Sequence, residues 1–263
     1  MSLPFVRIDA FTTDAFAGNP AAVCVLPDDQ DAEWMQLVAR EMNAGATAFL
    51  RKRVDGYDLR WFAPAAELEL CGHGTLASAH ALWEGGHLMT SSPARFYTRA
   101  GLLTAVRRGD WIELDFPAAH AQAVDPPVDL AVALGAPPRY VGQSRLDHLI
   151  ELDREDTVRH LRPDLARLAS IPGRGFIVTS RAASPNADFV SRFFAPSVGI
   201  DEDPVTGSAH CTLGPFWSAR LGKDDLVGRQ LSDRGGVVKV SVAGDRVRLS
   251  GQAVTVLRGE LLA

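Results

Sequence analysis

One repeated pattern constrains the fold of this chain more than any other feature. When Gly72 is aligned with Gly207, an offset of 135 residues, the segment TRAGLLTAVRRGDWIEL matches DRGGVVKVSVAGDRVRL without a gap. The short motif RWFAP at 60–64 also returns as RFFAP at 192–196, three residues out of that register. A run of matches at one offset predicts an internal duplication, in which each copy forms a similar unit.

Each copy carries the pattern of several short strands and one apolar helix. In the first copy the strand patterns FVRIDAF, AAVCVL, ATAFLRK and DLRWFA accompany an amphipathic helix at 31–42. The segment at 75–85 (TLASAHALWEG) and the segment at 205–222 (VTGSAHCTLGPFWSARLG) are apolar on nearly every side. Helices of this kind are buried, so each unit is predicted to enclose one of them.

These patterns predict an α+β fold of two pseudo-symmetric barrel-like units, each a mixed β-sheet wrapped around a buried central helix. We expect a first domain at 1–122 and a second at 123–263, joined near the proline-rich segment DPPVD at 125–129. The last strand pattern, at 253–262, could instead pack with the first domain.

The composition narrows the functional classes. With a net charge of −5 and no basic tract, the chain offers no face for neutralising phosphates, so we expect no nucleic-acid partner. Three cysteines without CxxC spacing fit a reducing compartment and predict neither a disulfide scaffold nor a metal site. Because no stretch approaches 18 apolar residues and the N-terminus has a strand pattern, we expect no membrane partner and a cytoplasmic location.

Both apolar helices are predicted to begin at a glycine turn. The unpaired N–H groups and the dipole of a helix N-terminus favour a carboxylate, and glycine lets a ligand approach the backbone. In a duplicated fold the equivalent helix starts can face each other across a cleft. We therefore expect a small anionic metabolite between them. Its carboxylate is expected to contact Gly72 and Gly74 in one half, and Thr206 and Gly207 in the other.

The side chains at the two turns differ. The first turn carries His73, next to glycine and outside the helix interior, which favours a functional role. The second carries Asp203, Ser208 and His210. Asp203-Pro204 also fits a helix start with Asp as N-cap and Pro at the first helical position, so a capping role competes with a proton-accepting one. Ser208 could bind the substrate or only satisfy backbone groups.

A thiol at the first turn raises a further alternative. Cys71 lies where a helix start can lower a thiol pKa, and it could serve a hydrolase or a lyase. A two-thiol racemase would need a second cysteine at the equivalent position, where the offset places Thr206. Cys211 lies further on, inside the predicted helix, so we interpret Cys71 as a packed thiol.

At these motifs the sequence resembles the PhzF-like phenazine-biosynthesis isomerases, which have the diaminopimelate-epimerase fold. The stretches that carry the resemblance are FVRIDAFTTDAFAGNPAAVCVL, REMNAGATAFL, RWFAPAAELELCGHGTLASAHAL and GIDEDPVTGSAH. The resemblance implies two facing barrels with a site between them, no metal or organic cofactor, and a homodimer. It also implies proton transfer on a small carboxylate-bearing substrate.

Residue by residue, the resemblance places the family's catalytic His on His73, its Asp on Asp203 and its Ser on Ser208. The principal acid/base of the family is a Glu in a segment similar to EMNLSETAF. Here that segment reads EMNAGATAF, and Ala46 stands where the Glu would be. A positioned acid/base contributes about 10²- to 10⁴-fold in rate, so this departure bears directly on the mechanism.

Three interpretations of Ala46 stay open at this point. Asp203 and His73 could carry the proton transfer alone, on a different substrate. Glu41 or Glu69 could replace the missing carboxylate. The protein could also be a non-catalytic small-molecule binding protein derived from this isomerase fold. We favour a cofactor-independent isomerase, with Asp203 as the main acid/base and His73 as its partner.

Overall fold

A computed structural model describes residues 2–262, which divide into two compact units. The first contains the chain up to Phe116 and again from Ser250 onward, and the second is Pro117–Leu249. This differs from the expected division into 1–122 and 123–263, and the segment at 125–129 lies inside the second unit. The difference has a structural cause. The C-terminal strand β17 (Ala253–Leu261) returns to the first unit and pairs with β1 (Leu3–Ala10).

The first unit is a mixed sheet around a buried helix. Its central helix α2 (Gly72–Glu84) is buried along nearly its whole length and contacts β1, β2, β3, β7 and β17. The sheet combines antiparallel pairs with the parallel pairs β2–β3 and β4–β6. Its other strands are β2 (Asn19–Leu26), β3 (Ala46–Lys52), β4 (Tyr57–Phe62), β5 (Glu67–Leu68), β6 (Ala94–Thr98), β7 (Gly101–Arg108) and β8 (Trp111–Pro117).

An amphipathic helix covers another face of this sheet. Helix α1 (Ala32–Met42) begins after Asp31, whose carboxylate accepts the Trp34 N–H, and ends at Asn43 in the left-handed conformation. Its buried face, which includes Met35 and Val38, packs with apolar side chains of β2, β3 and β4. The expected amphipathic helix is therefore present, one residue shorter at its start because Asp31 caps it.

The second unit has the same plan with an additional helical layer. Strands β11–β12 and β13–β14 pair in parallel, and their neighbours pair antiparallel. An apolar cluster lies between these strands and the short helices α3 to α5. The strands are β9 (Gln122–Ala123), β10 (Tyr140–Gln143), β11 (Asp147–Glu151), β12 (Gly175–Arg181), β13 (Phe189–Phe194), β14 (Asp225–Gln230), β15 (Gly236–Ala243) and β16 (Arg246–Gly251). The helices are α3 (Leu130–Leu134), α4 (Glu155–Arg159), α5 (Leu165–Ser170), the 3₁₀ turn η1 (Pro196–Val198) and α6 (Gly207–Leu221).

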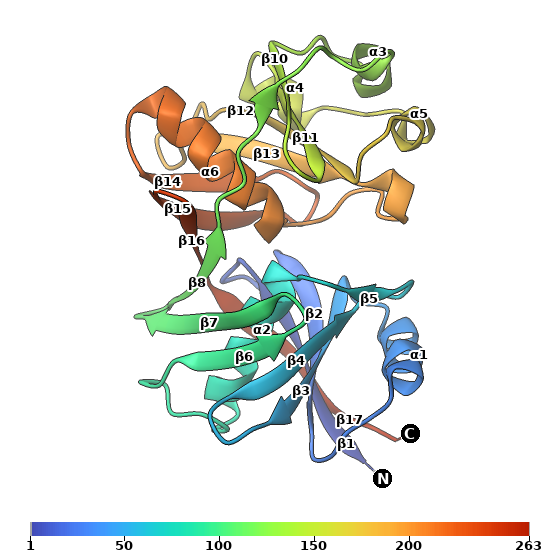
Figure 1. The fold of residues 1–263 in the computed structure, drawn as a ribbon, viewed down its shortest axis with the longest axis vertical. Helices are drawn as coiled ribbons and strands as arrows, with labels where there is room; N and C mark the ends of the chain where they lie inside the picture. Colours follow the sequence, from blue (N-terminus) through green and yellow to red (C-terminus); the bar gives the residue numbers. More distant parts are fainter. Residues whose placement is uncertain (1, 263) are drawn as a thin grey trace. The chain divides into compact units, whose positions relative to one another are not determined.

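Helix α6 is the central helix of the second unit, as α2 is of the first (Figure 1). Nine of its residues are buried, and it contacts β14 and β15. The fold is therefore the expected α+β arrangement, in which each unit wraps a mixed sheet around one apolar helix.

Equivalent elements of the two units begin at equivalent residues. Helices α2 and α6 start at Gly72 and Gly207, and strands β7 and β15 start at Gly101 and Gly236, each pair separated by the offset of the sequence repeat. The tight turns that follow β7 and β15 contain Gly109 and Gly244, both with φ of 62°, where glycine carries no steric penalty.

The arginines of the two RxFAP motifs also make matching pairs. Arg60 binds Glu67 with both Nε and Nη2, and Arg192 binds Glu202 in the same way. The partners lie seven residues apart in the first unit and ten in the second. The extra three residues correspond to the register difference between the motifs. These correspondences are what a duplicated chain predicts.

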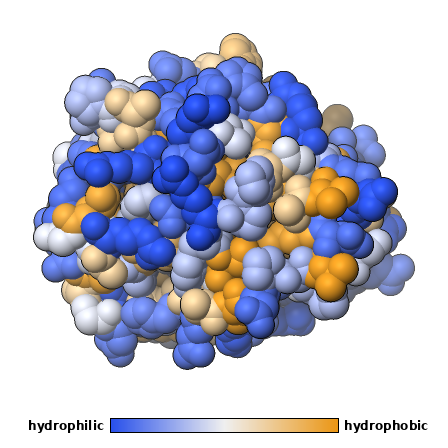
Figure 2. Space-filling model, turned by 90° about the horizontal axis from the view of Figure 1, so that it is seen from above, coloured by the Kyte–Doolittle hydropathy of each residue, from blue (hydrophilic) through white to orange (hydrophobic). Residues whose placement is uncertain are grey.

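The face of the molecule that is seen from above mixes polar and apolar side chains (Figure 2). On the face shown in Figure 2, hydrophilic residues are interspersed with small apolar groups. Among residues 2–262, no helix is both long and apolar enough to cross a membrane.

Candidate functional site

The first half of the candidate site is the start of helix α2. Cys71 is the N-cap of α2, and its Sγ accepts the Gly74 N–H at 3.4 Å. The His73 side chain lies beside it, with Nδ1 at 3.6 Å and Nε2 at 3.8 Å from Sγ, and only 8% of the residue is exposed. The helix start therefore holds a nearly buried imidazole in the first turn, where the resemblance places the catalytic His.

Gly74 is required by packing at this helix start. A Cβ on Gly74 would lie 2.7 Å from Cδ1 of the buried Trp61 and 2.9 Å from Cys71 Sγ. Its N–H is also engaged by Cys71. The expected role of Gly74 in binding a substrate carboxylate therefore has no support from its own hydrogen bonding. Gly72, the first residue of the helix, stays the candidate donor in this turn.

The segment that would carry the family's Glu passes next to His73. A Cβ on Gly45 would lie 2.9 Å from Asn19 Oδ1 and 3.4 Å from His73 Nε2. Ala46 is the first residue of β3 and has no exposed surface. Gly45 therefore lies beside His73 without a side chain, and Ala46, at the position of the family's Glu, carries only a methyl group. Glu41 and Glu69, the proposed substitutes, are both exposed to solvent.

The second half of the candidate site is the start of helix α6. The prediction that this helix begins at its glycine turn is confirmed, because α6 starts at Gly207. The alternative in which Asp203 is the N-cap, with Pro204 at the first helical position, is wrong, because the N-cap is Thr206. Asp203 instead lies in the non-helical segment before α6, and its Oδ2 accepts the Thr206 hydroxyl at 2.5 Å. Thr206 is the equivalent of Cys71, so both central helices have their N-cap residue at the same position of the repeat, although only Cys71 accepts a helix N–H with its side chain.

A buried glutamine explains why the helix does not begin at Asp203. Gln230, 1% exposed at the end of β14, accepts the Thr206 N–H with Oε1 at 2.9 Å. Its Nε2 donates to the Asp203 carbonyl at 2.6 Å and to Thr206 Oγ1 at 3.2 Å. These bonds fix the residues from Asp203 to Thr206 in a non-helical turn. Sequence reasoning missed Gln230, because it lies more than 20 residues downstream and in no motif.

Ser208 lies in the first turn of α6 and contacts an arginine. Arg174 donates from Nη2 to Ser208 Oγ at 3.0 Å, and the same guanidinium makes a two-point pair with Asp147. Ser208 is half-buried, so it is accessible where the resemblance places the substrate carboxylate. Neither Arg174 nor Asp147 stands out in the sequence, because each lies in a loop or strand end without a recognisable pattern.

His210 is a structural residue rather than a member of the site. It has no exposed surface, and its Nδ1 lies 2.8 Å from the Thr206 carbonyl. Burial lowers the pKa of His210 to about 4, so the ring is neutral near pH 7 and Nδ1–H is the donor of this bond. His210 therefore supports the α6 start from inside the unit.

The remaining cysteines do not form a thiol pair. Cys211 follows His210 inside α6, and burial raises the pKa of its thiol to about 12. Cys24 in β2 is also buried, and its thiol pKa is raised to about 12. A thiol in either position is protonated near pH 7 and is a poor base or nucleophile. Together with Thr206 at the position equivalent to Cys71, this argues against a two-thiol mechanism.

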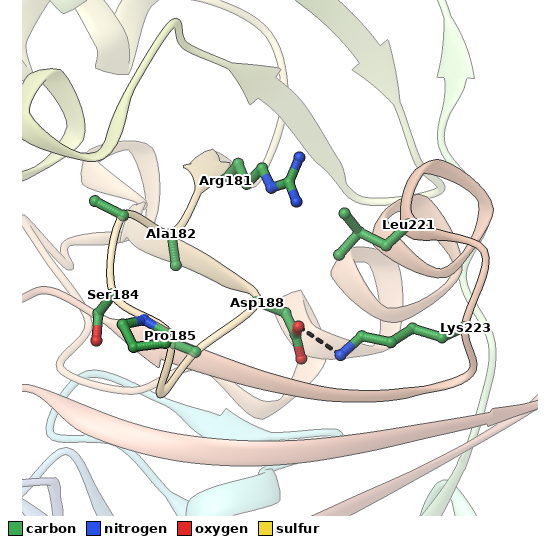
Figure 3. Close-up of a pocket in the computed structure, with 9 residues that line it drawn as sticks. Arg181, Ala182, Ser184, Pro185, Asp188, Leu221 and Lys223 are labelled. Carbon is green, nitrogen blue, oxygen red and sulfur yellow. Dashed lines mark ion pairs between the residues drawn. The ribbon is translucent and has the colours of Figure 1, made fainter.

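A surface cavity of about 410 Å³ in the second unit contains none of the expected site residues. Figure 3 shows Lys223 and Asp188 paired at its wall, with Arg181 from the end of β12, Ser184 from the β12–β13 connection and Leu221 from the end of α6. This cavity lies at the C-terminal end of α6, whereas the candidate site lies at the N-terminal end, at Gly207, so the two are separate.

The sequence model of phenazine biosynthesis-like proteins matches residues 8–259, nearly the whole chain. The chain belongs to this phenazine biosynthesis-like family. A curated relative, an uncharacterized isomerase from Halalkalibacterium halodurans, is 54% identical over 263 residues, which cover 100% of this chain and 99% of the relative.

Solved structures of the family share this fold. The crystal structure of a PhzF-family protein from Enterococcus faecalis is 38% identical, with a TM-score of 0.96 over 100% of both chains. A hydroxyproline epimerase from Agrobacterium vitis, crystallised with trans-4-hydroxy-L-proline, is 13% identical. Its TM-score of 0.66, over 99% of this chain and 92% of the epimerase, shows a common fold. The fold of this chain is therefore the epimerase-like fold that the resemblance implied.

Proposed function

We propose that this protein is a cofactor-independent isomerase that transfers a proton on a small carboxylate-bearing metabolite. The observation that carries the proposal is the pair of equivalent helix starts. One holds the His73 imidazole, and the other holds the Asp203 carboxylate and the Ser208 hydroxyl. The 54% identical relative is named an isomerase, which supports the same class of reaction.

In this proposal both helix starts act on one substrate. Asp203, held by the Thr206 hydroxyl, takes the proton from the carbon next to the substrate carboxylate. The Ser208 hydroxyl and the backbone N–H groups of Gly72 and Gly207 stabilise the negative charge that develops on the carboxylate oxygens. His73 gives a proton to another atom of the substrate. One proton leaves and one arrives, so the product is an isomer of the substrate.

Solvent deuterium exchange tests the proposal. The protein is incubated in D₂O with single small acids, including trans-4-hydroxy-L-proline, other amino and hydroxy acids, and unsaturated carboxylic acids. Mass spectrometry then reports deuterium bound to carbon. We expect exchange into at least one acid, reduced about 10²- to 10⁴-fold in Asp203→Asn, because an amide can accept the Thr206 hydrogen bond but cannot take a proton.

Asp164→Asn is the matched control for that experiment. Asp164 is likewise an aspartate whose side chain accepts a hydrogen bond near a helix start, in its case from the Arg167 N–H at the exposed start of α5, and it has no proposed role in proton transfer. Its variant should exchange deuterium as fast as the wild type. If no acid exchanges with the wild-type protein at any pH between 5 and 9, the isomerase proposal fails.

A second candidate function is small-molecule binding without turnover. The observation that favours it is the completely buried methyl group of Ala46 at the position of the family's acid/base. In that case an acid would raise the melting temperature of the wild type and of Asp203→Asn equally, with no deuterium exchange in either. Ala46→Glu separates a decayed enzyme from an original binding protein. Exchange gained by the variant would show that the catalytic geometry is retained.

We also propose that the protein is a homodimer, as the resemblance implies, and that it is located in the cytoplasm, as its sparse cysteines and the lack of a long apolar stretch predict. Light scattering at several concentrations measures the molar mass in solution. A mass of one chain, about 28.3 kDa, across that range would exclude the dimer.

A further inference from the structure

Arg174 is fixed more firmly than a surface arginine usually is. Its Nε and Nη2 donate to the two carboxylate oxygens of Asp147, at 2.8 and 2.5 Å, and Asp147 is 2% exposed. Its backbone N–H donates to Leu146 O at 3.0 Å, and its carbonyl accepts the Ser197 hydroxyl at 3.2 Å. Both ends of the residue are therefore held, and the guanidinium has little rotational freedom.

Asp147, which accepts both hydrogen bonds from Arg174, is itself held in place. Ser144 Oγ donates to the Asp147 carbonyl and accepts the Asp147 N–H, which closes a tight turn before β11. A carboxylate this deeply buried is costly unless it is paired, and the two-point bond with Arg174 supplies the pairing. Arg174 therefore occupies one position, with Nη2 directed to Ser208 Oγ at 3.0 Å.

The chemistry of guanidinium sets the direction of the bond to Ser208. Guanidinium has only donors, so Ser208 Oγ is the acceptor. Once its oxygen accepts this bond, the hydroxyl proton of Ser208 must point elsewhere, and it becomes the donor that a ligand meets at the first turn of α6. Because Asp147 neutralises the charge of Arg174, the arginine acts mainly through the orientation of Ser208 and less through its own attraction for an anion.

We propose that Arg174, held by Asp147, is a positioning residue that presents the Ser208 hydroxyl as a hydrogen-bond donor. The substrate atom that meets Ser208 is then an acceptor, such as a carboxylate oxygen, and an ammonium group is disfavoured there. The effect of Arg174 on catalysis rests on the proposed function. Its effect on the position of Ser208 does not, because that position can be measured without any substrate.

The position of Ser208 Oγ, on which the direction of its hydroxyl depends, is tested first, by the three-bond Hα–Hβ couplings of Ser208 in the NMR spectrum of the full chain. Lysine can pair with Asp147 through one point but cannot also reach Ser208 with a second arm. We expect a single Ser208 rotamer in the wild type and rotamer-averaged couplings in Arg174→Lys. Arg167→Lys is the matched control, because Arg167 pairs with the exposed Asp164 and does not contact Ser208. Couplings that are unchanged in Arg174→Lys would overturn the proposal.

A second variant covers the case in which Arg174→Lys fails to fold. Asp147→Asn combined with Arg174→Gln removes both charges together, so no unpaired buried carboxylate is left. This double variant should show the same averaged Ser208 couplings. If Ser208 keeps one rotamer in it, Arg174 does not position the hydroxyl, and the proposal is wrong.

The catalytic consequence is tested by a double-mutant cycle on the deuterium exchange rate. Misplacement of a substrate-holding group by about 1 Å can cost on the order of 10²-fold, so we expect Arg174→Lys to lower the rate by about 10- to 100-fold. In the Ser208→Ala background the same change should have no further effect. Equal effects in both backgrounds would overturn a role through Ser208. If the wild type exchanges no acid, the proposed function fails and the coupling measurement alone decides the role of Arg174.

Discussion

At the start of α6, one buried glutamine makes three hydrogen bonds to the residues that carry the proposed chemistry. Gln230 bonds the Asp203 carbonyl and both the N–H and the hydroxyl oxygen of Thr206. The Thr206 hydroxyl accepts from this amide and donates its own proton to Asp203 Oδ2. A chain of bonds thus runs from the core to the proposed base. The position of Asp203 depends on a residue that no local motif would identify.

Replacement of Gln230 by leucine tests this dependence. The Thr206 N–H and the Asp203 carbonyl would lose their partner beside a buried side chain, and each unsatisfied group costs roughly 1–3 kcal/mol. We expect the free energy of unfolding in urea to fall by roughly 3 kcal/mol. Gln122→Leu, on the exposed strand β9, should change it by less than about 0.5 kcal/mol. If the Gln230→Leu variant is as stable as the wild type, the segment from Asp203 to Thr206 keeps its conformation without Gln230.

At the scale of elements, the two central helices show which features a sequence can predict. Both were predictable because their residues are apolar on nearly every side, and the strand at 46–52 follows the predicted ATAFLRK segment residue for residue. The glycine turn predicted the start of α6 at Gly207, whereas the competing Asp-Pro signal, which would start the helix at Pro204, is overruled by a glutamine from β14. Arg174 and Asp147 were not predictable either, because the fold brings Arg174 from a loop to both Ser208 and the Asp147 carboxylate at the start of β11.

His210 makes the stability of α6 dependent on pH. Its folded-state pKa of about 4 lies below the unfolded value near 6.5, so its contribution is present above pH 6.5 and is lost as the pH falls toward 4. Between pH 7 and pH 5 this residue should cost about 2 kcal/mol of the free energy of unfolding. Urea titrations at the two pH values measure the difference.

His210→Asn is the variant that isolates this effect. Asparagine has no proton to gain, and its amide can still donate to the Thr206 carbonyl, so the variant should be less stable at pH 7 but should lose about 2 kcal/mol less on acidification. His120→Asn is the control, because His120 is exposed, and its variant should keep the wild-type pH dependence. Equal pH dependence in the wild type and in His210→Asn would show that His210 is not buried as a neutral ring.

At the scale of the whole molecule, the first unit is closed by the last strand of the chain. Strand β17 pairs with β1 from Leu3 opposite Leu261 to Ala10 opposite Ala253, and Figure 1 shows the red C-terminal strand beside the blue N-terminal one. The Gln252 carbonyl also accepts the Phe11 N–H at 2.7 Å. The first unit therefore cannot be completed until the rest of the chain has been made. A division of the sequence into two consecutive domains does not place the last strand in the first unit, although the strand pattern at 253–262 left that possibility open.

A chain that ends at Gly251 tests this closure. Without β17, strand β1 keeps only β2 as a partner, so its amides should exchange with deuterium much faster than in the full chain. Strands β12 to β14 of the second unit should keep their protection, since none of them pairs with β17. Hydrogen exchange followed by mass spectrometry of peptides gives both values. Unchanged protection in β1, or an equal loss in all strands, would contradict this description of the units.

The central claim is that Asp203 and His73 act on one substrate from two equivalent helix starts. The most direct test is a crystal structure of the protein with a bound acid that exchanges deuterium, or with trans-4-hydroxy-L-proline if several do. The account predicts that the reacting carbon lies about 3–3.5 Å from the Asp203 carboxylate, with the His73 ring within reach of the same molecule and the acid's carboxylate on Ser208 Oγ. An acid that touches only one of the two helix starts would contradict it.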